Sequence, residues 1–196
     1  MSTGTRTAGS TMDVREALQV SPSDFRLRPY GWLILLRSLP GLVSIVLSGL
    51  ESVVWAGALL LGSVGADLLV SWHAKRRGWE KHESELEIEG FVDFTCFVWA
   101  PLQFGFVLFS PVALVIPAVV FALAGMFRLA RFNVEGVVAG GYRGLPVTYN
   151  GVLFPIAGLL SHYVDGMAAV AGFDAMLLTL AALMASGRFV TPEVSP

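Results

Sequence analysis

The sequence predicts an all-α, polytopic membrane protein with six transmembrane helices. The chain of 196 residues is 55% apolar and has a mean hydropathy of +0.68. Only 14% of the residues are charged, whereas soluble domains carry roughly 25%. The apolar segments are continuous rather than alternating, which fits membrane helices and excludes a transmembrane barrel.

Each apolar span approaches the ~20 residues that a helix needs to cross a bilayer. The spans cover about residues 30–49, 52–74, 88–109, 111–130, 147–165 and 168–187. We expect an N-terminal tail over residues 1–28, with a candidate interfacial helix, and a short C-terminal tail over 189–196. Between them, residues 29–188 form the six-helix transmembrane domain. The N-terminal tail lacks an apolar region before a cleavage site, so we do not expect a signal peptide.

The basic residues predict the orientation. With six spans, the thirteen Lys and Arg residues lie in or near the tails, the second-to-third hairpin or the fourth-to-fifth loop, except Arg37. The positive-inside rule then places both termini and both long polar connections in the cytoplasm of a multi-pass cell-membrane protein. The net charge of −2, with no basic face, gives no support for a nucleic-acid partner.

Three acids near the cytoplasmic ends of the second and third spans are the candidate site. Asp67 precedes Lys75 by eight residues, about 12 Å along a helix, so it lies below the membrane surface. Glu89 and Asp93 are four residues apart and share a helical face. If the two spans pack side by side, the three carboxylates converge, a donor set suited to Mg²⁺ or Mn²⁺. The alternative is that these acids reach the headgroups or pair with nearby basic residues.

The positions of the other charged residues near this site allow more than one interpretation. Arg128 and Arg131 share a face at the end of the fourth span, and Arg143 follows in the next loop. They form either a phosphate clamp or a plain cytoplasmic anchor. For Arg37 we favour a side chain that reaches the cytoplasmic interface over one that points into the acid cluster. We expect Glu80, Glu83, Glu85 and Glu87 to form a solvated face of the hairpin.

The pattern resembles the CDP-alcohol phosphotransferases, which have six transmembrane helices and the signature D-x2-D-G-x2-A-R-x8–9-G-x3-D-x3-D. Asp67, Ala74 and Asp93 match its first Asp, its Ala and its last Asp. The segments RLARFN at 128–133 and YRGLPVTYNG at 142–151 resemble the CDP-diacylglycerol–serine O-phosphatidyltransferases of that family. The resemblance covers roughly residues 30–187.

The resemblance implies phospholipid biosynthesis: transfer of a phosphatidyl-type group from a CDP-activated lipid to a small alcohol acceptor, foremost serine, with release of CMP. Asp93 would be the catalytic base, and Asp67 and Glu89 would hold Mg²⁺ or Mn²⁺. Ser71, Ala74 and Lys75 would bind the nucleotide. Lipid phosphate or the acceptor would be bound by Arg128, Arg131 and Arg143. The family's usual state implies a homodimer embedded in membrane lipid.

The chain departs from the signature at several positions. Val70 stands at the second Asp, Ser71 at the Gly, Lys75 at the Arg, Glu85 at the next Gly and Glu89 at the third Asp. A non-catalytic or altered-specificity protein of the same fold that binds lipid or nucleotide is therefore the alternative hypothesis. A transporter or channel is disfavoured, because no internal repeat and no continuous polar path are visible.

Overall fold

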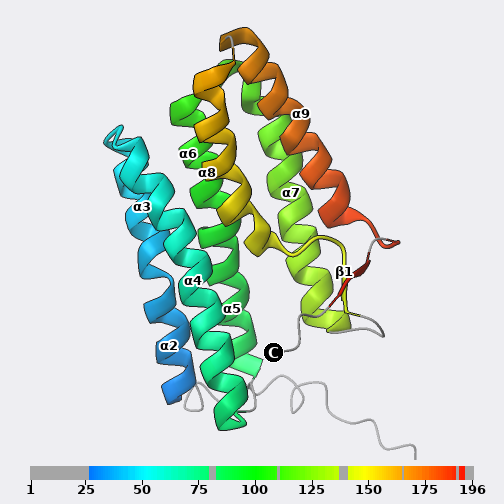
Figure 1. Ribbon diagram of the computed structural model, residues 1–196. Helices are drawn as coiled ribbons and strands as arrows, with labels where there is room; N and C mark the ends of the chain where they lie inside the picture. The colour runs from blue at the N-terminus through cyan, green and yellow to red at the C-terminus, as the bar shows by residue number, and fades with distance from the viewer. Residues whose placement is uncertain are drawn as a thin grey trace, which may run out of the picture.

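The computed structural model describes residues 27–79, 83–109, 111–136, 141–164, 166–188 and 190–192. The predicted N-terminal interfacial helix lies outside these residues. The structure is mostly helical, as predicted. The helices pack lengthwise into a bundle with α2, α3, α4 and α5 along one side and α7 and α9 along the other (Figure 1). Between the two sides lie α6 and α8.

The first half of the bundle consists of three helical spans. Helices α2 (Pro29–Arg37) and α3 (Leu39–Gly49) form one broken span, because Pro40 lacks the N–H that would continue the helix past Ser38. Helix α4 (Val53–Arg77) returns alongside α3. The next span consists of α5 (Glu83–Phe94), a π-helical turn (Thr95–Trp99) and α6 (Ala100–Leu108).

The second half carries the loop between α7 and α8, which lies at one end of the bundle (Figure 1). Helix α7 (Pro111–Glu135) packs along α9 (Gly166–Ala185). Strand β1 (Tyr142–Arg143) pairs antiparallel with β2 (Val190–Thr191), so the chain end returns to the loop after α7. Helix α8 (Asn150–Leu160) is flanked by 3₁₀ turns at Val147–Tyr149 and Ser161–Tyr163 and packs against α4 and α6.

Among the described residues, five helical segments are long and apolar enough to cross a membrane: Pro29–Gly49, Val53–Arg77, Ser84–Leu108, Val115–Glu135 and Gly166–Ala185. The predicted fifth span, 147–165, is where the structure departs from the expected six. Its α-helical part, α8, has only 11 residues. Several apolar helices nevertheless indicate a membrane-embedded protein, and a sixth crossing stays a prediction.

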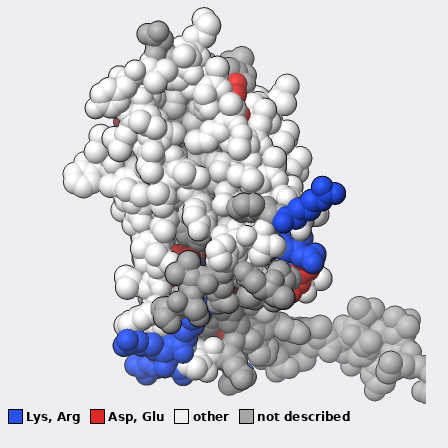
Figure 2. All heavy atoms as spheres, turned by 45° about the vertical axis from the view of Figure 1, so that its right-hand side comes forward, with Lys and Arg blue, Asp and Glu red and all other residues white. Residues whose placement is uncertain are grey.

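The outer surface fits a lipid environment. Large apolar side chains point outward from several helices, among them Val54, Phe91 and Ile116, which are 82%, 76% and 76% exposed. Most of the visible surface away from one end carries no charge, and Lys and Arg gather near that end (Figure 2). Exposed apolar area of this extent is typical of surfaces that contact lipid or a partner.

A buried polar contact joins the central helices. Pro101 has no N–H to donate to the carbonyl of Phe97, four residues earlier. Asn150, at the start of α8 and fully buried, donates from Nδ2 to that carbonyl oxygen over 2.8 Å. The side chain thus stabilises a backbone group that the α6 proline would leave without its helical donor.

Candidate functional site

The three predicted acids converge, and they do so on an arginine. The Arg37 guanidinium forms ion pairs with Asp67, Glu89 and Asp93. Its Nη2 atom lies 2.7 Å from Asp93 Oδ1 and 3.5 Å from Glu89 Oε1, and Nη1 pairs with Asp67 Oδ1. The convergence of Asp67, Glu89 and Asp93 was predicted from their spacing, on the condition that the second and third spans pack side by side.

The local structure explains this placement. Arg37 is the last residue of α2, and α2 packs against both α4 and α5. Asp67 comes from α4, while Glu89 and Asp93 lie one turn apart on α5. The C-terminal end of a helix also favours a cation. Three helices therefore bring one positive and three negative side chains to one depth.

The favoured prediction for Arg37, a side chain that reaches the cytoplasmic interface, was wrong. The residue is only 5% exposed and points into the acid cluster instead. A buried charge needs a partner of opposite charge. The carboxylates of α4 and α5 surround the guanidinium and supply that charge. The solvated-face prediction was also wrong for Glu85, which is 1% exposed and packs beside Gly31.

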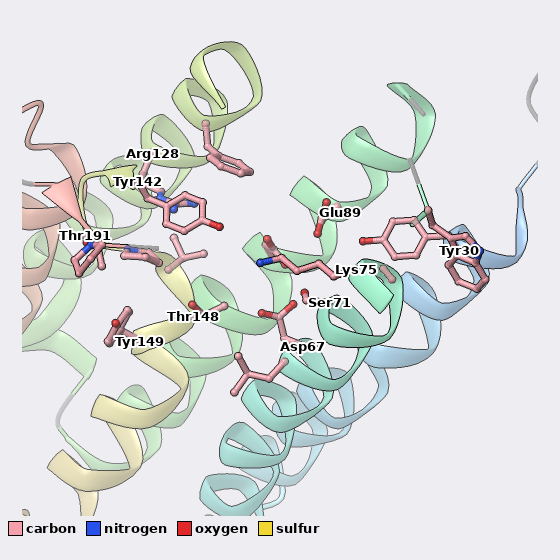
Figure 3. Close-up of a pocket in the computed structure, with 18 residues that line it drawn as sticks. Tyr30, Asp67, Ser71, Lys75, Glu89, Arg128, Tyr142, Thr148, Tyr149 and Thr191 are labelled. Carbon is pink, nitrogen blue, oxygen red and sulfur yellow. The ribbon is translucent and has the colours of Figure 1, made fainter. Parts of the chain in front are cut away.

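The acids form one wall of a pocket with a volume of about 370 Å³. Asp67 and Glu89 face Arg128, Tyr142 and Thr148 across it (Figure 3). Ser71, Ala74 and Lys75, the predicted nucleotide-binding residues, line the same pocket one and two turns after Asp67 on α4. The structure thus brings together most of the residues that the sequence selected. Arg37 does not line the pocket and lies behind the carboxylates.

Arg128 is the cation on the opposite wall. It is 6% exposed, lines the pocket, and stacks over the Phe132 ring at 5.1 Å from the ring centroid. Within the described part of the chain it forms no ion pair, and its Nε atom has no hydrogen-bond partner. A buried guanidinium of this kind is suited to an anionic ligand such as phosphate.

Arg131 lies outside the pocket lining, although it shares a helical face with Arg128. Its guanidinium donates to the carbonyl oxygens of Met184, Ala185, Ser186 and Arg143 at 3.0–3.1 Å. These include carbonyls at the end of α9, which lack helical donors. Arg131 therefore joins the end of α9 to the loop after α7.

Gly144 allows the backbone segments at this junction to approach closely. Its φ of +75° is strained for other residues, and an added Cβ would lie 2.5 Å from the Met184 carbonyl oxygen and 2.6 Å from Arg131 Nη2. The third predicted cation, Arg143, is also outside the pocket lining: it is exposed and pairs with Glu135 at 3.7 Å. The RLARFN and GLP segments thus position the pocket wall, and of the three arginines only Arg128 lines it.

Several pocket residues were not selected from the sequence. Tyr30 and Trp79 pack edge to face, with ring centroids 5.9 Å apart, at one end of the pocket. Phe132 and Tyr142 pack at the other end at 5.7 Å. Thr191 lines the pocket through the pairing of β2 with β1. The aromatic residues carry no periodic signal, and the position of Thr191 depends on a long-range strand pair.

The donor set does not fit a divalent metal ion. Mg²⁺ or Mn²⁺ needs carboxylate oxygens that are free to coordinate it and whose negative charge is not already offset by another cation. One oxygen each of Asp67, Glu89 and Asp93 is already engaged by Arg37, and Val70 stands at the remaining signature acid. Within the described ranges, no group of three His, Cys, Asp or Glu side chains is arranged to hold a metal ion.

Comparison with known proteins adds no family assignment. No family model matches the chain, and no curated protein matches it.

Proposed function

We propose that the protein transfers a phosphatidyl-type group from a CDP-activated lipid to a small alcohol, with serine as the first acceptor to test. The observation that carries this proposal is the shared pocket. Asp67, Ser71, Ala74, Lys75, Glu89 and Asp93, which occupy the positions of the resembling signature, line it together with Arg128. Their common location supports one ligand site.

The charges of the pocket suit a phosphorylated headgroup. Lys75 and Arg128 lie on opposite walls and would bind the diphosphate, while the acyl chains extend into lipid. Ser71 and Ala74 are the residues that the cytidine nucleotide would approach. The Lys and Arg residues gather near one end of the visible face (Figure 2), which supports a cytoplasmic pocket by the positive-inside rule.

The reaction requires one proton acceptor. The acceptor hydroxyl oxygen attacks the β-phosphorus, and the bond between that phosphorus and the bridging oxygen breaks. The bridging oxygen leaves with the electron pair as part of CMP, and Asp93 takes the hydroxyl proton. Arg37 holds Asp93 Oδ1 at 2.7 Å and so orients the base. Lys75 and Arg128 offset the charge on the phosphoryl oxygens.

A non-catalytic binding protein of the same fold is the second candidate. Two observations favour it: Val70 replaces a signature acid, and Arg37 pairs with the residue that would act as base. Such a protein would bind the CDP-activated lipid in the same pocket without cleaving its diphosphate.

Turnover separates the two candidates. Purified protein is incubated with CDP-diacylglycerol and radiolabelled serine, and both CMP and labelled lipid are measured. The transferase proposal predicts equal amounts of both products and a loss of at least about 100-fold in Asp93→Asn, because general-base catalysis contributes that much. Glu87→Gln, on the exposed side of α5, is the matched control. Saturable binding of the lipid without CMP would favour the second candidate.

A further inference from the structure

We infer that the Arg37 guanidinium is the cation of the carboxylate cluster, and that the protein therefore takes no divalent metal at Asp67, Glu89 and Asp93. This inference concerns the resting site and does not rest on the transferase proposal. It follows from the position of one arginine that contacts all three acids.

The cluster needs a positive charge. The side chains of Asp67, Glu89 and Asp93 are 16%, 13% and 19% exposed, so water screens them poorly. The three carboxylates contact the same guanidinium, so they lie close enough to repel one another. Inside a membrane protein, such a group requires an ion or a basic residue between its members. The Arg37 side chain, 3% exposed, already occupies that position.

The geometry favours a guanidinium in particular. Arginine presents several N–H donors in a planar fork, so one side chain can bond carboxylates from two directions. Here Nη1 contacts Asp67 of α4, and Nη2 contacts Glu89 and Asp93 of α5. A lysine at the same position has one charged nitrogen and cannot reproduce this division.

Metal entry would require displacement of Arg37. The guanidinium lies behind the pocket wall at the end of α2, and it would lose its carboxylate partners if a cation took their oxygens. A buried charge without a partner is strongly unfavourable. Val70 offers no oxygen in compensation. The site is therefore closed to metal while Arg37 is present, and removal of Arg37 should convert it into a cation site.

The test is Mn²⁺ binding, measured by the electron paramagnetic resonance signal of free Mn²⁺ with protein in detergent. We expect no saturable binding to the wild type. Arg37→Met should bind one Mn²⁺ per chain at least tenfold more tightly than the wild type, and Arg37→Met/Glu89→Gln should lose that gain. Arg37→Lys, which keeps a positive charge beside the acids, should bind Mn²⁺ more weakly than Arg37→Met.

Two results would overturn the inference. One is binding of one Mn²⁺ per chain by the wild type that is lost in Asp67→Asn. The other is a folded Arg37→Met variant that binds Mn²⁺ no more tightly than the wild type. If Arg37→Met does not fold, the comparison of wild type with Asp67→Asn still decides. Lipid substrate is absent from these measurements, so failure of the transferase proposal leaves their outcome unchanged.

Discussion

Replacement of Arg37 by Met should destabilise the protein more than any exposed charge change. The substitution keeps much of the side-chain volume but leaves three partly buried carboxylates without their shared cation. Removal of one partner from a buried ion pair costs about 3–5 kcal/mol. Because the acids are 13–19% exposed, we expect a loss near the lower end, about 3 kcal/mol. The assay is the free energy of unfolding from detergent-denaturant titration.

A double-mutant cycle isolates the pairing. Asp93 lies 2.7 Å from Arg37 Nη2 and Glu89 lies 3.5 Å away, so Asp93 should couple more strongly. We expect Arg37→Met and Asp93→Asn together to cost about 1–3 kcal/mol less than their sum. The exposed pair Arg143 and Glu135 is the matched control, with an expected coupling below about 1 kcal/mol. Additive effects of the Arg37 and Asp93 changes would refute the pairing.

Three further changes test other parts of the structure. Gly144→Ala should lower the free energy of unfolding by more than about 1 kcal/mol, because the φ of Gly144 is +75° and a Cβ there would meet Met184. The control Gly49→Ala, with open space around the residue, should change the free energy of unfolding by less than about 0.5 kcal/mol. Asn150→Leu should cost about 1–3 kcal/mol in thermal-unfolding measurements, since it removes the donor to the buried Phe97 carbonyl. Arg128→Met should weaken CDP-diacylglycerol binding by roughly 10- to 100-fold, the value of a charge-assisted hydrogen bond, and unchanged affinity would exclude Arg128 from the ligand site.

Local spacing was sufficient to predict part of the site. The i, i+4 relation of Glu89 and Asp93, with Asp67 at a similar depth on the neighbouring helix, predicted the convergence of the acids. The prediction assumed that the second and third spans pack side by side; in the structure α2, which carries Arg37, packs against both α4 and α5. The helical periodicity also placed Ser71 and Ala74 on the face of Asp67, and both line the pocket; Lys75 was selected only through the family resemblance.

Long-range packing decided what the sequence left open. The environment of Arg37 depends on how α2 meets α4 and α5, which no periodicity within α2 encodes. Arg128 and Arg131 share a helical face, yet one side chain reaches the pocket and the other the end of α9. Glu85 is buried because α5 begins early enough to place it against α2. Each outcome depends on a neighbouring element distant in sequence.

We propose that the pocket cleaves a CDP-activated lipid without a divalent metal, because Arg37 already offsets the charge of the carboxylates in its wall. The most direct measurement is CMP release from CDP-diacylglycerol and serine by the wild type in excess EDTA, beside Asp93→Asn. We predict CMP release that persists in EDTA and is lost in Asp93→Asn. Absence of CMP from the wild type, with or without Mn²⁺, would contradict the transferase, and release that requires Mn²⁺ would contradict the role of Arg37.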